Sequence, residues 1–138
     1  MIVVDANVAV KWVIEQAHFE QARSIVEQGD DLLVPGMFVA EVTSTLWQYA
    51  RARQIDKEQA TRGVASILSL ISYVERDVHL ADDALSIGLE LNYAPYDCFY
   101  LVLAMRRSAP LVTADKKLIN RLATTRYKSH VIHLSDWT

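Results

Sequence analysis

The residues of this sequence with the clearest chemical potential are four carboxylates that border apolar segments: Asp5, Glu41, Asp97 and Asp115. If the fold brings them together, each pair about 5 Å apart would repel by roughly 3 kcal/mol at an effective dielectric constant near 20. A hard cation relieves such repulsion, and carboxylate oxygens favour Mg²⁺ or Mn²⁺ over metals that prefer sulfur ligands. Because Mg²⁺ also binds phosphate oxygens, a site of this kind is suited to the hydrolysis of phosphodiester bonds.

Each of the four acids also has an ordinary explanation when it is taken alone. Asp5 and Asp115 follow apolar runs, where an Asp commonly caps the next helix. Glu41 lies beside an apolar helical row and can be a solvated flank. Asp97 precedes the apolar segment Cys98–Met105, where the dipole of a helix favours an anion in the first turn. Position alone therefore does not decide between a structural and a chemical role.

The elements that must position these acids alternate between strand and helix patterns. Short apolar runs predict buried strands at Ile2–Val4 and Leu32–Val34. Further strands are predicted at Tyr73–Val78, Pro110–Thr113 and Val131–Leu134. Apolar residues at three- and four-residue spacing predict helices through Phe38–Tyr49 and Ala60–Ile71. Cys98–Met105 is apolar on every side, which predicts a buried helix. The alternation indicates an α/β fold with a parallel sheet covered on both faces, whose ligands bind at the carboxyl ends of the strands.

Length and composition indicate one globular domain over residues 1–138. The chain is 51% hydrophobic and 22% charged, and it has no linker-like or repetitive segment. Its single cysteine excludes an internal disulfide, which suits a cytoplasmic location. The apolar opening of residues 1–14 is interrupted by Asp5, Asn7 and Lys11, so we expect neither a signal peptide nor a membrane span.

The net charge of −3 disfavours a nucleic-acid partner at first sight, but the distribution of charge does not. Seven of the fourteen basic residues lie between Arg106 and Lys128, where the only acid is Asp115. This stretch predicts a locally positive surface that binds phosphates, and its candidate RNA-binding residues are Arg106, Arg107, Lys116, Lys117 and Arg121. For any single one of them, a solvated helix face is the simpler interpretation.

Four segments resemble the PIN-domain ribonucleases, particularly the VapC-type toxins of toxin–antitoxin pairs. They are VVDANVAVKW, VAEVTSTLW, APYDCFYLVLA and LVTADKKL, which occur in the family's order across essentially the whole chain. The resemblance implies a three-layer PIN-like fold with a five-stranded parallel sheet of order 3-2-1-4-5. It also implies an endoribonuclease that depends on Mg²⁺ or Mn²⁺ and cleaves structured RNA. As the toxin of a type II pair, it would form a homodimer and be neutralised by a VapB-type antitoxin.

The resemblance also implies roles for individual residues. Its acidic positions, which hold the metal and carry catalysis, fall on Asp5, Glu41, Asp97 and Asp115. Asn7 and Thr113 match polar positions that would orient carboxylates or water, although local turn and cap hydrogen bonds explain them equally well. Some relatives carry a further acid after the last Asp, whereas Lys116 and Lys117 stand here. We therefore expect one ion held by the protein, or a second ion that is recruited only with the substrate phosphate.

Two other functions are compatible with parts of the pattern. A catalytically weak PIN-like module that binds RNA or protein would share the fold, and only metal-dependent turnover separates it from the nuclease. A phosphoacceptor receiver domain is also a small α/β unit with acids at strand ends. It fits poorly, because the first strand is not followed by an adjacent acidic pair.

Overall fold

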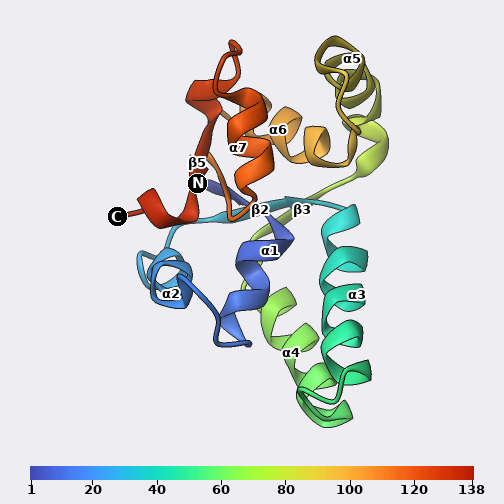
Figure 1. The fold of residues 1–138 in the computed structure, drawn as a ribbon, viewed down its shortest axis with the longest axis vertical. Coiled ribbons are helices and arrows are strands. Elements are labelled where there is room, and N and C mark those ends of the chain that lie inside the picture. The colour runs from blue at the N-terminus through green and yellow to red at the C-terminus, as the bar shows by residue number, and fades with distance from the viewer.

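A five-stranded parallel sheet forms the middle layer of the structure, a computed structural model that describes all 138 residues (Figure 1). The strands are β1 (Ile2–Val4), β2 (Leu32–Pro35), β3 (Tyr73–Glu75), β4 (Leu111–Thr113) and β5 (Val131–His133). Their spatial order is β3-β2-β1-β4-β5, with every neighbouring pair parallel. The predicted α/β class and the predicted strand order are both confirmed.

Helices cover both faces of this sheet. They are α1 (Ala6–Ala9), α2 (Phe19–Glu27), α3 (Met37–Arg51), α4 (Lys57–Ser69), α5 (Ala81–Leu91), α6 (Tyr96–Arg107) and α7 (Lys116–Leu122). Short 3₁₀ turns lie at Val10–Trp12, Asp77–His79, Lys128–His130 and Leu134–Asp136. In Figure 1, α1 to α4 lie on one side of the sheet and α5 to α7 on the other. No helix is both long enough and apolar enough to cross a lipid bilayer.

Helix α6 is the central helix that the apolar segment Cys98–Met105 predicts. It packs against β1, β2 and β4, and its residues Tyr100 to Ala104 are all buried. Strands β1, β2 and β4 are buried along their whole length, as expected for a parallel sheet covered on both faces. The edge strand β3 differs, since Tyr73 and Val74 remain exposed.

Strand β3 is shorter than predicted, because it ends at Glu75 instead of continuing to Val78. Its partner β2 ends at Pro35, which pairs with Glu75, and the chain then turns into α3 through Gly36. Asp77 accepts a hydrogen bond from the backbone N–H of Met37 at 3.2 Å, which draws residues after Glu75 toward the start of α3. Strand β3 ends at Glu75 because β2 ends at Pro35 and has no further backbone groups in position to pair with it.

The strand order places the carboxyl ends of β1 and β4 at the point where the direction of winding reverses. The backbone N–H of Asp5 donates to the carbonyl of Val112 at 3.1 Å, and Val4 lies in register with Val112. Asp5 therefore emerges beside Thr113, at the position where sheets of this type bind ligands.

The corner between α5 and α6 sets the position of the residues that precede Asp97. Asn92 ends α5 in the left-handed conformation with φ 49°, and the backbone N–H of Tyr93 donates to the carbonyl of Gly88 at 2.9 Å. A Cβ atom at Gly88 would lie only 2.9 Å from the carbonyl oxygen of Tyr93. The missing side chain at Gly88 thus allows the loop to close tightly before α6 begins.

Candidate active site

One pocket of about 310 Å³ at this edge of the sheet contains all four of the acids selected from the sequence. It is lined by Asp5, Ala6, Asn7, Val10, Gln16, Glu41, Thr45, Tyr49, Asp97 and Asp115. The carboxylates come from the end of β1, the second turn of α3, the first turn of α6 and the residue before α7. Segments separated by up to 110 positions in the sequence therefore meet in one pocket.

Asp5 is the most buried of these acids, with only 4% of its surface exposed. Although it occupies the N-cap position of α1, its side chain makes no capping hydrogen bond. Instead its Oδ2 atom accepts hydrogen bonds from Thr113 Oγ1 at 2.7 Å and Asn7 Nδ2 at 3.2 Å. A hydrogen bond from the backbone N–H of Asn7 also reaches this carboxylate.

Asn7 and Thr113 join the ends of β1 and β4 around this carboxylate. Asn7 Oδ1 accepts from the backbone N–H of Ala114 at 3.0 Å, and Thr113 Oγ1 accepts from the backbone N–H of Asp115 at 3.0 Å. Thr113 is completely buried. Both side chains therefore contact the Asp5 carboxylate and the backbone that leads to Asp115, so local turn bonding and carboxylate orientation occur together.

Two tyrosines that were not predicted from the sequence form hydrogen bonds to two of the other acids. Tyr100 Oη donates to Glu41 Oε1 at 2.8 Å, and Tyr93 Oη donates to Asp97 Oδ2 at 3.1 Å. Tyr100 is 1% exposed, and a buried phenol needs a polar partner. A hydroxyl inside the otherwise apolar segment Cys98–Met105 was the signal that could have identified Tyr100.

Asp115 caps a helix and also lines the acidic pocket. Its Oδ1 atom accepts from the backbone N–H groups of Lys117 at 2.8 Å and Leu118 at 3.3 Å, which caps the N-terminus of α7. The same side chain lines the acidic pocket. Capping orients the carboxylate toward the start of α7 without removing it from the pocket.

Burial and mutual repulsion weaken the acidity of three of the carboxyl groups. Burial is the main cause of the raised pKa of Asp5, which lies at about 7; the hydrogen bond from Thr113 opposes this increase, and the charges of Asp97 and Glu41 add to it. Burial also raises the pKa of Glu41 and of Asp97, against the hydrogen bonds from their tyrosines. The charge of Asp115 further raises the pKa of Asp97. The four acids therefore interact electrostatically as one group.

This group of negative charges has no cationic side chain to balance it. None of the ion pairs in the structure includes Asp5, Glu41, Asp97 or Asp115. Four carboxylates in a shared pocket without a basic partner form an environment that favours a cation. The oxygen-only donor set fits a hard divalent ion such as Mg²⁺ or Mn²⁺.

The carboxylates line the pocket without forming a ready-made ligand set. No group of three or more His, Cys, Asp or Glu side chains is arranged to hold a metal ion directly. Mg²⁺ keeps several of its waters and commonly takes only one or two protein carboxylates. A hydrated ion bound by part of the group therefore fits this arrangement better than an ion enclosed by all four acids.

The candidate RNA-binding residues lie outside the lining of the acidic pocket, and three of them have partners on the protein. Arg106 pairs with Asp83 at 2.7 Å, and Arg107 pairs with Glu75 at 3.4 Å. Arg121 donates to the carbonyl of Leu91 at the end of α5. Lys116 and Lys117 open α7, directly after Asp115, and take part in no ion pair. The two lysines are therefore the members of this set closest in sequence to the pocket.

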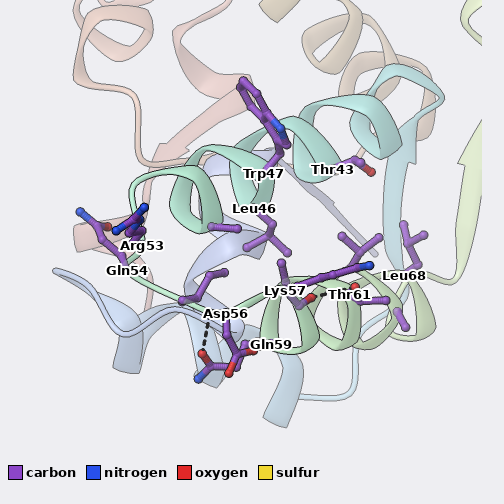
Figure 2. Close-up of a pocket in the computed structure, with 15 residues that line it drawn as sticks. Thr43, Leu46, Trp47, Arg53, Gln54, Asp56, Lys57, Gln59, Thr61 and Leu68 are labelled. Carbon is purple, nitrogen blue, oxygen red and sulfur yellow. Dashed lines mark hydrogen bonds between the residues drawn. The ribbon is translucent and has the colours of Figure 1, made fainter.

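A larger groove of about 1070 Å³ lies between α3 and α4 and shares no lining residue with the acidic pocket (Figure 2). Its lining is mainly apolar and includes Leu46, Val64 and Leu68. In Figure 2, Leu46 points into the space between the two helices, whereas Trp47 stands out from α3. Trp47 is 55% exposed, which is unusual for so large an apolar side chain. Asp56 is the only carboxylate in its lining, so the groove has no acidic cluster like that of the smaller pocket.

Comparison with known proteins shows similarity over most of the chain. Exonuclease VapC9 of Pyrobaculum aerophilum is 27% identical over 103 residues, which are 75% of this chain and 74% of that protein. The crystal structure of PAE2754 from the same organism has a TM-score of 0.73 and 25% identity, covering 97% of this chain and 83% of that chain. A toxin–antitoxin complex from Klebsiella pneumoniae has a TM-score of 0.70 and 15% identity, covering 97% and 98%. The sequence model of the PIN domain matches residues 2–124 of this chain, with the acidic pocket inside the match, and the chain therefore belongs to the PIN-domain family.

Proposed function

We propose that this protein is an endoribonuclease that depends on Mg²⁺ or Mn²⁺, cleaves structured RNA, and acts as the toxin of a type II toxin–antitoxin pair. The observation that carries the proposal is the pocket in which four carboxylates meet without a basic partner. The family match and the similarity to a protein named exonuclease VapC9 support a nuclease in particular.

In this proposal some side chains of the pocket bind the cation and others orient the Asp5 carboxylate. Asp5, Glu41, Asp97 and Asp115 provide the oxygen atoms that hold the cation and its waters. Asn7 and Thr113 keep the Asp5 carboxylate in place through their hydrogen bonds. When bound, the cation supplies positive charge to the scissile phosphate and makes an attacking water more acidic. No side chain of the pocket is assigned as an indispensable general base.

We further propose that a VapB-type antitoxin neutralises the protein and that the protein forms a homodimer. The groove between α3 and α4 offers an apolar surface for such a partner, on the same helix that carries Glu41. Trp47 on α3 is exposed beside this groove, whereas Trp12, in the 3₁₀ turn Val10–Trp12, donates its indole N–H to the carbonyl of Ala22 at 2.8 Å. Trp47 therefore contributes surface to an antitoxin, and Trp12 anchors α2.

Removal of divalent cations is expected to abolish RNA cleavage. Partner-free protein would be incubated with transfer RNA, and with a circular RNA of the same sequence, in Mg²⁺, in Mn²⁺ or in EDTA. The proposal predicts discrete cuts in both RNAs that require the divalent ion, since a circle has no end from which an exonuclease can start. Sequencing of the fragments would locate the cuts, and fragments with 5′-phosphate and 3′-hydroxyl ends are expected.

Each alternative outcome of this assay has a definite meaning. Degradation of linear but not circular RNA would show an exonuclease and overturn the proposed cleavage mode. RNA binding without turnover under every metal condition would favour the catalytically weak scaffold. Cutting that continues undiminished in EDTA would remove the role proposed for the carboxylates. Partner-free protein that is fully inert would also contradict regulation by an antitoxin.

Thr113→Val is expected to lower the cleavage rate about ten- to hundredfold, the usual effect of losing a group that orients a metal-binding side chain. The substitution removes the hydroxyl that donates to Asp5 and accepts from the Asp115 N–H. Thr113→Ser keeps the hydroxyl and is expected to retain most of the activity. The measurement is the initial rate of transfer-RNA cleavage as a function of Mn²⁺ concentration. Equal rates for the two variants would show that the hydroxyl has no part in the reaction.

A further inference from the structure

One wall of the acidic pocket carries hydrogen-bond donors that no role described above requires. Gln16 and Tyr49 both line the pocket, and Gln16 Nε2 donates to the hydroxyl of Tyr49. Lys11 lies just outside the lining of the pocket, and its Nζ atom donates to Gln16 Oε1 at 3.3 Å. Lys11, Gln16 and Tyr49 are called the donor wall below.

The directions of these hydrogen bonds leave unused donors on the donor wall. The Tyr49 oxygen accepts from Gln16, and its own proton has no acceptor in the structure. The Lys11 ammonium group has three protons, and Gln16 accepts only one of them. The four carboxylates in the same pocket are acceptors when ionised. The pocket thus combines acceptors, which suit a cation, with donors, which suit an anion.

Lys11 is also a half-buried cation without a counter-ion. It takes part in none of the ion pairs of the structure, whereas Arg106, Arg107 and Arg126 each pair with a carboxylate. Burial lowers the pKa of Lys11 from its ordinary value. Removing a charge from water without a partner is unfavourable, and an anionic ligand offsets that cost.

We infer that Lys11, Gln16 and Tyr49 bind a phosphate group of the RNA chain beside the acidic pocket and so position the substrate. The inference rests on the proposed nuclease function and adds to it the residues that bind the substrate. Lys11 provides the charged contact, Tyr49 provides a neutral donor, and Gln16 holds the two together. The three residues are positioning residues, because the reacting groups are assigned to the carboxylate side of the pocket.

A purely structural role would also explain these bonds, since they tie the segment after β1 to α3. The two roles differ in their dependence on salt. Each phosphate contact made by a cation contributes about 0.7 to 0.9 to the slope of log affinity against log salt concentration. A lysine that only stabilises the fold contributes nothing to this slope.

The test is the binding of fluorescently labelled transfer RNA at a series of NaCl concentrations with Mg²⁺ present. All proteins carry Asp97→Asn, which removes one pocket carboxylate and is expected to prevent cleavage. Lys11→Met is expected to weaken binding about tenfold at low salt and to reduce the slope by about one. Lys11→Arg keeps the charge and is expected to keep the slope. Tyr49→Phe is expected to weaken binding a few fold with the slope unchanged.

Lys57→Met is the matched control, because Lys57 lines the groove between α3 and α4 and not the acidic pocket. It is expected to bind as the parent protein does. With Asp97 intact, Lys11→Met is expected to raise KM about tenfold while kcat changes less than about threefold. If Lys11→Met fails to fold, the comparison of Tyr49→Phe with its parent still tests the donor wall.

The outcomes separate this inference from the proposed function. An unchanged slope for Lys11→Met, or an equal loss for Lys57→Met, would overturn the inference while metal-dependent cleavage stands. Protein that never cuts RNA but shows the expected loss of slope would overturn the nuclease and retain the phosphate contact. Absence of any transfer-RNA binding would overturn both.

Discussion

Asp97→Asn is expected to lower the rate of RNA cleavage at least about a thousandfold while the fold is kept. The change removes one negative charge from the pocket and keeps the shape of the side chain, so the hydrogen bond from Tyr93 retains an acceptor. A thousandfold decrease corresponds to about 4 kcal/mol of lost transition-state stabilisation, which is the scale of a cation's contribution to phosphate chemistry. The measurement is single-turnover cleavage of transfer RNA in saturating Mn²⁺.

Asp82→Asn is the matched control for this prediction. Asp82 also lies in the first turn of a helix, α5, but its side chain is exposed and does not line the pocket. Both substitutions remove a negative charge from the first turn of a helix, but only Asp97 lies in the acidic pocket. Circular dichroism and thermal unfolding would establish that the variants are folded. Cleavage by Asp97→Asn at the rate of Asp82→Asn would remove Asp97 from the proposed mechanism.

Asp5→Asn is expected to make the metal-free protein more stable at pH 8, although the same change removes a proposed metal ligand. The pKa of Asp5 is raised from 3.8 to about 7 in the folded protein, mainly by burial. Between these values the unfolded chain loses the proton and the folded protein keeps it. The wild-type stability therefore falls as pH rises from about 4 to about 7, by up to about 4 kcal/mol for three pKa units. An amide does not ionise and avoids this loss.

The measurement for Asp5→Asn is urea unfolding in EDTA at a series of pH values. The stability gain over wild type is expected to be greatest above pH 7 and to vanish toward pH 4. The amide oxygen of the variant can accept the hydrogen bonds from Thr113 and Asn7, which both donate to Oδ2 of Asp5. A variant that is less stable than wild type at pH 8 would show that ionised Asp5 is well stabilised without a metal. Saturating Mg²⁺ is expected to reduce the difference, because the ion binds the wild-type protein, with four carboxylates, more tightly than the variant, with three.

Several elements of the fold were predictable because their residues carry local signals. The strands β1 and β4 are short apolar runs, and α6 is a helix whose apolar character on every side indicates burial. The end of β3 was not predictable in this way, since it depends on where β2 stops pairing. A strand boundary set by a neighbouring strand leaves no signal in its own residues.

The residues of the candidate site also fall into those with a local sequence signal and those without one. Asp5 and Asp115 were recognisable from their positions after strands, and Glu41 and Asp97 from their places beside apolar helical segments. Tyr93, Gln16 and Tyr49 had no such signal, because each is polar or aromatic in an ordinary local context. The hydrogen bond between Gln16 and Tyr49 exists only once α3 and the segment after β1 are packed together, whereas the bond from Tyr93 to Asp97 depends on the corner before α6.

The sequence alone determined the α/β class, the strand order through resemblance to a family, and the four acidic positions. It could do so because apolar periodicity and residues at element ends are local properties of the chain. The tertiary structure decided that the acids share one pocket without an ion-pair partner, that burial makes Asp5 a weak acid, and that Gln16 and Tyr49 line the same pocket. These properties arise from distances and from exclusion of water, which exist only when distant segments come into contact.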